Sequence, residues 1–374
     1  IEYEKTVLIG LITQFQDEEK ATEYLDELEF LAYTAGGEVL KRFTQKMDTP
    51  NPKTFIGTGK MEEVRAYVDQ YEIGTAIFDD ELRPAQIKNL ERIFDCKVLD
   101  RTSLILDIFA QRASTREGKM QIEMAQLQHI LPRLTRMWSH LSRQKGGIGM
   151  RGDGESQLEV DRRRIQERIS RLHRELEDVK RVRSTQRQGR QRNNWPLVSI
   201  VGYTNAGKST LLNTLTDAGV RSENRMFSTL DPITRRIGLP GGGAVLVTDT
   251  VGFINKLPPT IVAAFRATLE EIEESSVILH VVDITHQRAQ EQADVVDEIL
   301  DGMSVGHIPR IVVYNKVDLL EDRSVDRAPR NSTLNDVSNS GAVYVSAKTG
   351  LNMTGLLKRL EATLQGQRAE VSTL

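Results

Sequence analysis

The chain has 374 residues, of which 39% are hydrophobic and 28% are charged, and its formal net charge is −3. These fractions are those of a globular protein, and the length allows two or three domains. The single cysteine, Cys96, excludes an internal disulfide framework, and no apolar run approaches the roughly 18 residues of a membrane-spanning helix. We therefore expect a cytoplasmic protein, attached at most peripherally to a membrane or a larger particle.

Strand and helix patterns alternate through residues 1–112, which we predict to be a first domain. The β-rich runs are residues 5–12, 37–43, 75–78 and 97–99, and the helical patterns are residues 18–33, 61–70 and 84–94. Such alternation is typical of a parallel sheet with helical crossovers. The sequence therefore predicts a small parallel α/β domain.

One loop of this domain, residues 51–60, is rich in turn residues and ends in Gly57-Thr58-Gly59-Lys60. The glycines and the lysine suggest a phosphate-binding loop, but the spacing is wrong and no Ser or Thr follows Lys60. A structural loop is the favoured interpretation, and a second contact to a nucleotide or to RNA is the alternative.

Residues 113–190 are predicted to form a helical hairpin with a coiled-coil-like seam. Apolar residues recur at alternating steps of 4 and 3 in two runs: Met120, Met124, Leu127, Leu131, Leu134, Trp138 and Leu141, then Ile165, Ile169, Leu172, Leu176 and Val179. Pro132 is expected to kink or break the first helix. We expect the two helices to pack antiparallel within a monomer, with homodimerisation through the seam as the alternative.

The hairpin region is strongly basic. Residues 133–192 contain 17 Lys and Arg residues against 8 Asp and Glu residues, a balance of +9, so the rest of the chain carries −12. The tip, residues 145–163, contains five glycines with Lys145 and Arg151 among them, as suits a flexible loop. This charge distribution points to an anionic partner such as nucleic acid, although a basic helix is often only a solvated face. Residues 187–194 are expected to be a linker into a third domain, residues 191–374.

The most specific motif is Gly202-Tyr203-Thr204-Asn205-Ala206-Gly207-Lys208-Ser209, between an apolar run and a helical pattern that starts at Thr210. A strand that delivers such a loop to a helix N-terminus makes a cradle of backbone N–H groups for di- and triphosphates. Lys208 is expected to reach the β- and γ-phosphates, and the Ser209 hydroxyl to ligate Mg²⁺.

Two further segments are expected at the end of the site that binds the phosphates and the metal. Asp249-Thr250-Val251-Gly252 ends another apolar run, so we expect Asp249 to hold Mg²⁺ through a water and Gly252 to approach the γ-phosphate. A threonine between the two motifs must complete the metal shell. We choose Thr229 in Phe227-Ser228-Thr229-Leu230-Asp231, with Thr234 as the rival and Ser228 less favoured. The three glycines at 241–243 are predicted to be a hairpin turn.

Two later segments, each placed after a strand-like run, are expected to bind the base. In Asn315-Lys316-Val317-Asp318, the Asp318 carboxylate can accept hydrogens from the N1–H and the amine of guanine, while Asn315 bridges loop and base and Lys316 covers the ring. In Ser346-Ala347-Lys348, the Ala347 N–H is expected to meet the guanine O6. Such a site rejects adenine, because its buried partners would stay unpaired.

In this order the segments resemble the G1, G3, G4 and G5 elements of P-loop GTPases, and Phe227-x-Thr229-Leu-Asp-Pro232 resembles the G2 element of the Obg–HflX group. Gly152-x-Gly-Glu-Ser-Gln-Leu-Glu-x-Asp-Arg-Arg163 is similar to the signature of HflX GTPases, with mild departures at Asp153, Ser156 and Val160. The resemblance spans nearly the whole chain. It implies a Mg²⁺-dependent GTPase that binds the large ribosomal subunit and its RNA, and that dissociates ribosomes or rescues stalled ones under stress.

Phe253 stands where many GTPases carry a glutamine that orients the attacking water. We therefore expect slow intrinsic hydrolysis that the ribosome stimulates, with Lys208, Thr229 and Gly252 as the catalytic residues. Three other functions stay open. They are ribosome assembly or RNA remodelling, a GTP switch that regulates a protein partner, and a coiled-coil interaction protein with vestigial nucleotide binding.

Overall fold

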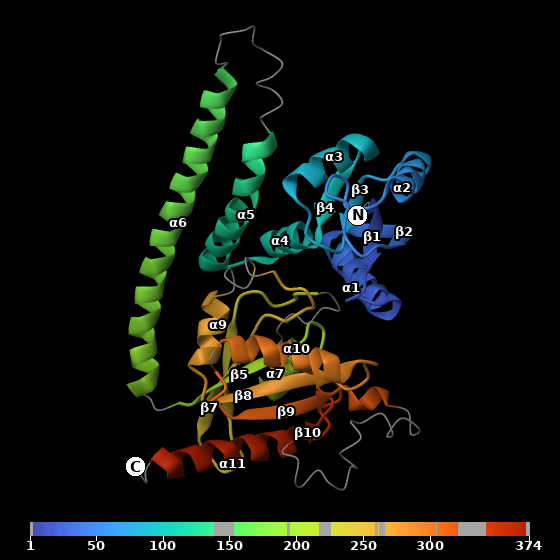
Figure 1. Ribbon diagram of the computed structural model, residues 1–374. Coiled ribbons are helices and arrows are strands. Elements are labelled where there is room, and N and C mark those ends of the chain that lie inside the picture. The colour runs from blue at the N-terminus through green and yellow to red at the C-terminus, as the bar shows by residue number, and fades with distance from the viewer. Residues whose placement is uncertain are drawn as a thin grey trace. The chain divides into compact units, whose positions relative to one another are not determined.

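A computed structural model describes residues 3–137, 153–192, 195–216, 226–258, 261, 266–303, 305–320 and 342–371 of the chain. The chain divides into two units, Ile1–Val179 with Pro258–Ala264, and Lys180–Leu257 with Phe265–Leu374. Each unit is built on its own β-sheet (Figure 1). Among the helices in the described ranges, none is long and apolar enough to cross a membrane.

The first unit contains a four-stranded sheet in the order β2-β1-β3-β4, in which every pair is parallel. Val7, Ile9 and Phe78 of this sheet are almost fully buried and pack against Leu90 and Phe94 of a crossover helix. The predicted parallel α/β fold is confirmed. Its elements are β1 Glu4–Ile12, α1 Glu18–Ala35, β2 Gly37–Lys46, α2 Thr58–Tyr71, β3 Thr75–Phe78, α3 Pro84–Phe94, β4 Lys97–Asp100 and α4 Arg101–Arg112.

Helix α4 is an element that the sequence pattern did not predict. It follows β4 without a loop, because Asp100 both ends the strand and caps the helix. The Asp100 Oδ1 atom accepts hydrogen bonds from the Ser103 N–H at 2.9 Å and from the Ser103 hydroxyl at 2.6 Å. A side-chain oxygen at this position satisfies N–H groups that the first helical turn leaves unpaired.

Two long helices, α5 Arg116–Met137 and α6 Asp153–Arg192, lie side by side (Figure 1). The ion pairs Glu123–Arg168 and Arg116–Glu175 join them, and the residue number falls on one helix as it rises on the other. The helices are therefore antiparallel, as predicted. On α6 the seam residues are shielded and most of their neighbours are exposed, since Leu172 is buried and the other four are half-buried.

Three boundaries differ from the sequence-based expectations. Pro132 lies inside α5 without ending it, although it lacks a backbone N–H, and the next residue, Arg133, donates a hydrogen bond to Asp100. Helix α6 begins at Asp153, within the segment expected to be a flexible tip, and it extends to Arg192, through most of the expected linker. Arg, Gln and Glu are good helix formers, so a polar stretch without apolar periodicity continues the helix. Trp138 and Leu141 of the first seam lie outside the described residues.

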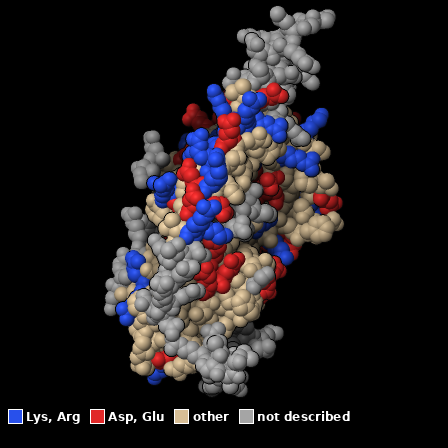
Figure 2. All heavy atoms as spheres, turned by 90° about the vertical axis from the view of Figure 1, so that its left-hand side faces the viewer, with Lys and Arg blue, Asp and Glu red and all other residues tan. Residues whose placement is uncertain are grey.

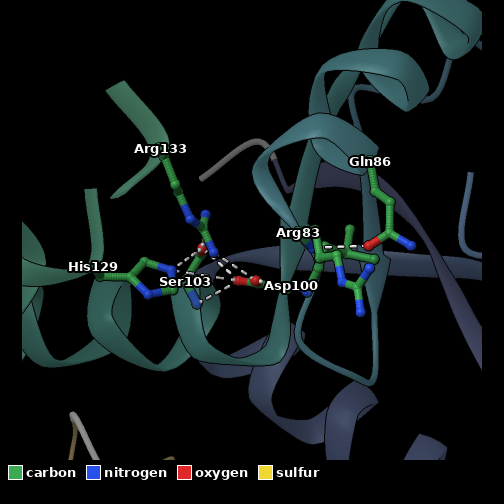
Figure 3. Close-up of polar contacts among 7 residues, drawn as sticks. Arg83, Gln86, Asp100, Ser103, His129 and Arg133 are labelled. Carbon is green, nitrogen blue, oxygen red and sulfur yellow. Dashed lines mark hydrogen bonds and ion pairs between the residues drawn. The ribbon is translucent and has the colours of Figure 1, made fainter. Parts of the chain in front are cut away.

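A buried polar cluster fixes α5 on α4 (Figure 3). The Asp100 Oδ2 atom accepts hydrogen bonds from Arg133 Nη2 at 2.7 Å and from the Leu82 N–H at 3.2 Å, and His129 Nε2 lies 3.2 Å from the Ser103 hydroxyl. Burial alone would raise the pKa of Asp100, but His129 and Arg133 outweigh it and hold that pKa below its usual range. The carboxylate therefore stays charged and fully partnered.

The second unit contains a six-stranded sheet in the order β10-β9-β8-β5-β7-β6, in which only the β6–β7 pair is antiparallel. Residues 241–243 belong to the β6–β7 hairpin turn, as predicted, and Gly242 and Gly243 adopt positive φ there. The elements are β5 Leu197–Gly202, α7 Lys208–Thr216, β6 Ile233–Gly238, β7 Ala244–Asp249, α9 Arg266–Glu273, β8 Val277–Asp283, α10 Ala289–Gly302, β9 Arg310–Asn315, the 3-10 helix η2 Val317–Leu319, β10 Val343–Tyr344 and α11 Met353–Val371.

Candidate functional site

The loop between β5 and α7 lies at the carboxyl ends of the parallel strands of the second unit, where open α/β sheets bind their ligands. It requires glycine where neighbouring groups approach closely. Gly207 has φ 95°, and a Cβ atom there would lie 2.3 Å from Asn315 Nδ2. The loop and its surroundings line one pocket, made by Thr204, Asn205, Gly207, Lys208, Ser209, Thr210, Phe227, Ser228, Thr229, Thr250 and Gly252.

The Lys208 side chain is folded back over this loop. Its Nζ atom donates hydrogen bonds to the Gly202 carbonyl at 3.1 Å and to the Tyr203 carbonyl at 2.8 Å, and the residue is 6% exposed. Burial lowers the pKa of Lys208 to about 8, against the opposing charge of Asp249. An amine held this way is positioned to bind an anion, whose charge would compensate for the lost hydration.

Two hydroxyls meet one carboxylate oxygen next to Lys208. Asp249 Oδ2 accepts hydrogen bonds from the Ser209 hydroxyl at 2.6 Å and the Thr229 hydroxyl at 2.7 Å, and the two hydroxyls lie 2.7 Å apart. The rival Thr234 lies on β6, where its hydroxyl pairs with that of Thr248 at 2.8 Å. Of the two threonines, only Thr229 therefore lies beside Ser209 and Asp249.

Asp249 itself is buried and incompletely partnered. Burial raises the pKa of Asp249, while Lys208 and the hydroxyls of Ser209 and Thr229 act against that rise. Its Oδ1 atom is buried and has no hydrogen-bond partner among the described residues. Buried polar atoms in folded proteins are rarely left unpaired, so this oxygen is available to a ligand.

The predicted base-binding segments come together at the other end of the loop. Asn315 Nδ2 donates to the Ala206 carbonyl at 2.8 Å, and the Ala347 N–H donates to Asn315 Oδ1 at 2.9 Å. The Ser346 hydroxyl donates to Asp318 Oδ1 at 2.7 Å and so orients that carboxylate. Asn315 thus joins the loop to the last motif, and its expected contact with the base stays a prediction.

Comparison with known proteins identifies the family. Three family models match the chain: "GTP-binding GTPase N-terminal" at residues 22–110, "GTP-binding GTPase Middle Region" at residues 112–190 and "50S ribosome-binding GTPase" at residues 197–316. GTPase HflX of Flavobacterium psychrophilum is 46% identical over 98% of this chain and 91% of its own length. GTPase HflX of Escherichia coli is 44% identical over 98% of this chain and 84% of its own length. The chain belongs to the HflX family of GTPases.

Two solved structures are similar to the chain over nearly its whole length. The crystal structure of a GTP-binding protein from Sulfolobus solfataricus in complex with GDP is 25% identical, with a TM-score of 0.51, and covers 97% of this chain and 99% of that one. A crystal structure named SsGBP and GDP complex is 27% identical with a TM-score of 0.54 at the same coverage. The protein is therefore a GTPase, which binds GTP and hydrolyses it to GDP and phosphate.

The remaining expected site residues of this HflX protein fall into two groups. Those that line the pocket or are buried near it are Phe227, Ser228, Leu230, Thr250 and Val251, and Asp231, which follows Leu230, is half-buried. Those at the base-binding end are Lys316, which precedes η2, Val317 in η2, and Lys348, which is exposed. Their roles stay predictions.

One acidic residue of the base-binding end was missed by sequence reasoning. Asp283 ends β8, and its Oδ2 atom accepts a hydrogen bond from Lys316 Nζ at 2.6 Å. Its Oδ1 atom accepts from the Thr285 N–H and hydroxyl, so the carboxylate is held in place. The sequence did contain a signal for Asp283, because this residue ends a strand-like apolar run as Asp249 does. This ion pair holds the Lys316 stem at the base-binding end.

The loop of residues 51–60 in the first unit has partners of its own. The Gly57 N–H donates to Gln45 Oε1 at 2.8 Å, Asn51 and Phe55 exchange backbone hydrogen bonds, and Lys60 forms an ion pair with Glu63. These contacts favour the structural interpretation of this loop over a second nucleotide site.

Asp318→Asn is expected to weaken GTP and GDP binding at least about 100-fold, because an amide nitrogen replaces an oxygen that accepts a guanine hydrogen. Xanthosine nucleotides, which carry a carbonyl where guanine has its amine, are expected to bind the variant more tightly than the parent. Titration with fluorescent guanine and xanthine nucleotides measures both changes. Asp294→Asn on α10 is the matched control. Unchanged guanine affinity in the Asp318 variant would remove Asp318 from the site.

Proposed function

We propose that this HflX GTPase binds the large ribosomal subunit in its GTP-bound form, and that it dissociates ribosomes or rescues stalled ones under stress. The observation that carries the proposal is the exposed basic face of α6 in a chain with a GTPase site. Exposed arginines follow the described part of this helix: Arg162, Arg163, Arg164, Arg171, Arg174 and Arg181. Figure 2 shows Lys and Arg side chains gathered on this face among acidic ones. The description "50S ribosome-binding GTPase" of the matched family supports a ribosomal partner.

In the proposed GTP-bound state, Ser209, Thr229 and Asp249 hold Mg²⁺. These residues suit Mg²⁺ because their three side-chain oxygens, a type of ligand that this cation prefers, lie within hydrogen-bond distance of one another. Asp249 Oδ1 also has no partner among the described residues. When bound, the cation neutralises charge on the phosphate oxygens. The buried, raised-pKa carboxylate of Asp249 is the kind of group that a cation stabilises in its charged form.

The chain's own residues bind and orient the triphosphate. The Lys208 ammonium exchanges its two carbonyl partners for phosphate oxygens, and the backbone N–H groups of the loop and of the first turn of α7 bind the rest. Gly252 lies where a Cβ atom would be 2.9 Å from Lys208 Nζ, so its backbone approaches the γ-phosphate without obstruction. Loss of that phosphate releases Thr229 and Gly252, and this change lowers the affinity for the ribosome.

Hydrolysis is slow in the free protein and is stimulated by the ribosome. Phe253 is 2% exposed, its N–H donates to the Gly202 carbonyl at 3.2 Å, and its carbonyl accepts from the Thr204 N–H at 2.8 Å. An aromatic ring neither donates nor accepts the hydrogen bonds that a glutamine offers to water. Fast turnover without ribosomes would contradict this part of the proposal.

Sedimentation of purified ribosomes with this protein tests the function. With a non-hydrolysable GTP analogue we expect the protein to sediment with the large subunit and intact ribosomes to separate, whereas GDP gives neither effect. Binding should weaken steeply with salt, because contacts to RNA phosphates release counterions. Absence of both co-sedimentation and dissociation would overturn the proposal.

A pair of double variants isolates the basic helix in the same assay. Arg171→Glu with Arg174→Glu is expected to weaken co-sedimentation at least about 10-fold by reversing two exposed charges on α6. Lys358→Glu with Arg359→Glu, an exposed pair on α11, is the matched control with the same charge change. Binding that resists salt and ribonuclease would favour a protein partner instead.

A further inference from the structure

The nucleotide pocket contains a buried hydroxyl that the proposed roles leave unused. Thr204 is 7% exposed, and its Oγ1 atom has no hydrogen-bond partner among the described residues. The other buried hydroxyls that line the pocket all have partners. Ser209 and Thr229 bind Asp249, and Thr250 donates to the Ile200 carbonyl at 2.7 Å. The Thr204 hydroxyl is therefore the buried one available to the nucleotide or its attacking water.

The backbone places this side chain at the γ-phosphate end of the pocket. A Cβ atom built on Gly252 would lie 2.8 Å from both Thr204 Cα and Cγ2, and 2.9 Å from Lys208 Nζ. Thr204, Gly252 and the Lys208 amine thus converge on one point. Gly252 and Lys208 are the two groups expected at the γ-phosphate, so the Thr204 side chain lies next to both of them, with its methyl group toward Gly252.

The segment that carries glutamine in other GTPases, which here contains Phe253, is held next to Thr204 by hydrogen bonds. The Thr204 N–H donates to the Phe253 carbonyl, and the Asn255 N–H donates to the Tyr203 hydroxyl at 2.7 Å. Because Phe253 is buried and both its backbone groups are paired with the loop, this residue offers no polar group to the pocket. Thr204 is the loop residue whose backbone pairs with Phe253, so its side chain lies next to this segment.

We propose that Thr204 is a catalytic residue of GTP hydrolysis, whose hydroxyl hydrogen-bonds the attacking water and holds it in line with the γ-phosphorus. In the reaction, the bond from the water oxygen to the γ-phosphorus forms and the bond to the β–γ bridging oxygen breaks. The bridging oxygen stays on GDP, both water protons leave with the inorganic phosphate as H2PO4−, and Thr204 keeps its own proton. The inference rests on the nucleotide site proposed above but not on the ribosome as partner.

The test is single-turnover hydrolysis of GTP by the full chain without ribosomes. Thr204→Val keeps the shape and removes the hydroxyl, and it is expected to lower the rate about 10- to 100-fold, the effect of losing one hydrogen bond that orients the transition state. Thr204→Ser keeps the hydroxyl and is expected to stay within about 3-fold of the parent. GDP affinity should be unchanged in both variants. Affinity for GDP with aluminium fluoride, which mimics the transition state, should fall only in the valine variant.

Three outcomes would overturn the inference. They are a parental rate in Thr204→Val, an equally slow Thr204→Ser, and a loss of GDP affinity that matches the loss of rate, which would show a purely structural role. A Lys208→Met variant measured in parallel distinguishes an error in the nucleotide site from an error in the role of Thr204. If that variant binds GDP as tightly as the parent, the nucleotide site itself is wrong, whereas a parental rate in Thr204→Val alone removes only Thr204.

Discussion

Lys208→Met is expected to lower the affinity for GTP and GDP at least about 100-fold, because each charge-assisted hydrogen bond from its amine to a phosphate oxygen contributes about 1.5–3 kcal/mol. The amine is buried in the pocket and donates to two carbonyls that the Met side chain leaves without that donor. Isothermal titration with both nucleotides measures the change. Lys358→Met, at an exposed position on α11, is the matched control.

Stability of the nucleotide-free protein distinguishes lost binding from lost folding. Burial lowers the pKa of Lys208 to about 8, so its charged form is disfavoured in the folded protein. The melting temperature without nucleotide should therefore stay the same or rise in Lys208→Met, while the increase on adding GDP disappears. Nucleotide binding within threefold of the parent would show that the triphosphate lies elsewhere.

Arg101→Met is expected to destabilise the first unit by about 3–5 kcal/mol, the usual effect of removing one partner from a buried ion pair. The Arg101 guanidinium is 2% exposed and donates to Asp79 at 2.6 and 3.0 Å, to Glu27 at 2.5 Å and to the Tyr24 carbonyl at 2.9 Å. Burial alone would lower the pKa of Arg101, but the charges of Asp79 and Glu27 outweigh it and raise it. The variant leaves these two carboxylates buried without their cation.

The chain offers a matched control for this effect. Arg42 also pairs with two carboxylates, Asp26 and Glu29, but these side chains are 34% to 61% exposed. Arg42→Met is therefore expected to cost less than about 1 kcal/mol. Urea denaturation followed by circular dichroism compares the variants, and GDP affinity should be unchanged in both. Equal destabilisation by the two substitutions would show that burial does not increase the contribution of the Arg101 ion pairs to the free energy of unfolding.

Most secondary structure of this protein could be predicted from local patterns. The ranges 75–78 and 84–94 agree with β3 and α3 to the residue, because a short, fully buried run and a proline at the first helical turn are local signals. Helix α4 was missed because it starts at Arg101, directly after the last residue of β4, and because most of its buried residues are apolar and hide the helical period. The ends of α6 were misplaced because glycines at its start and a polar stretch at its end show no apolar periodicity. The helix nevertheless extends from Asp153 to Arg192.

The sequence by itself determined the chemistry of the site, since each GTPase motif is a short run of consecutive residues after a strand. It could not determine which threonine lies beside Ser209 and Asp249, that Asp283 holds Lys316, or that the buried Thr204 hydroxyl has no partner among the residues that the structure describes. Those facts depend on contacts between residues 20 to 40 positions apart, or about 50 for the Thr204–Phe253 pair. Only the packing of parallel strands in one sheet brings such residues to the same edge, and strand order is a property of the tertiary structure.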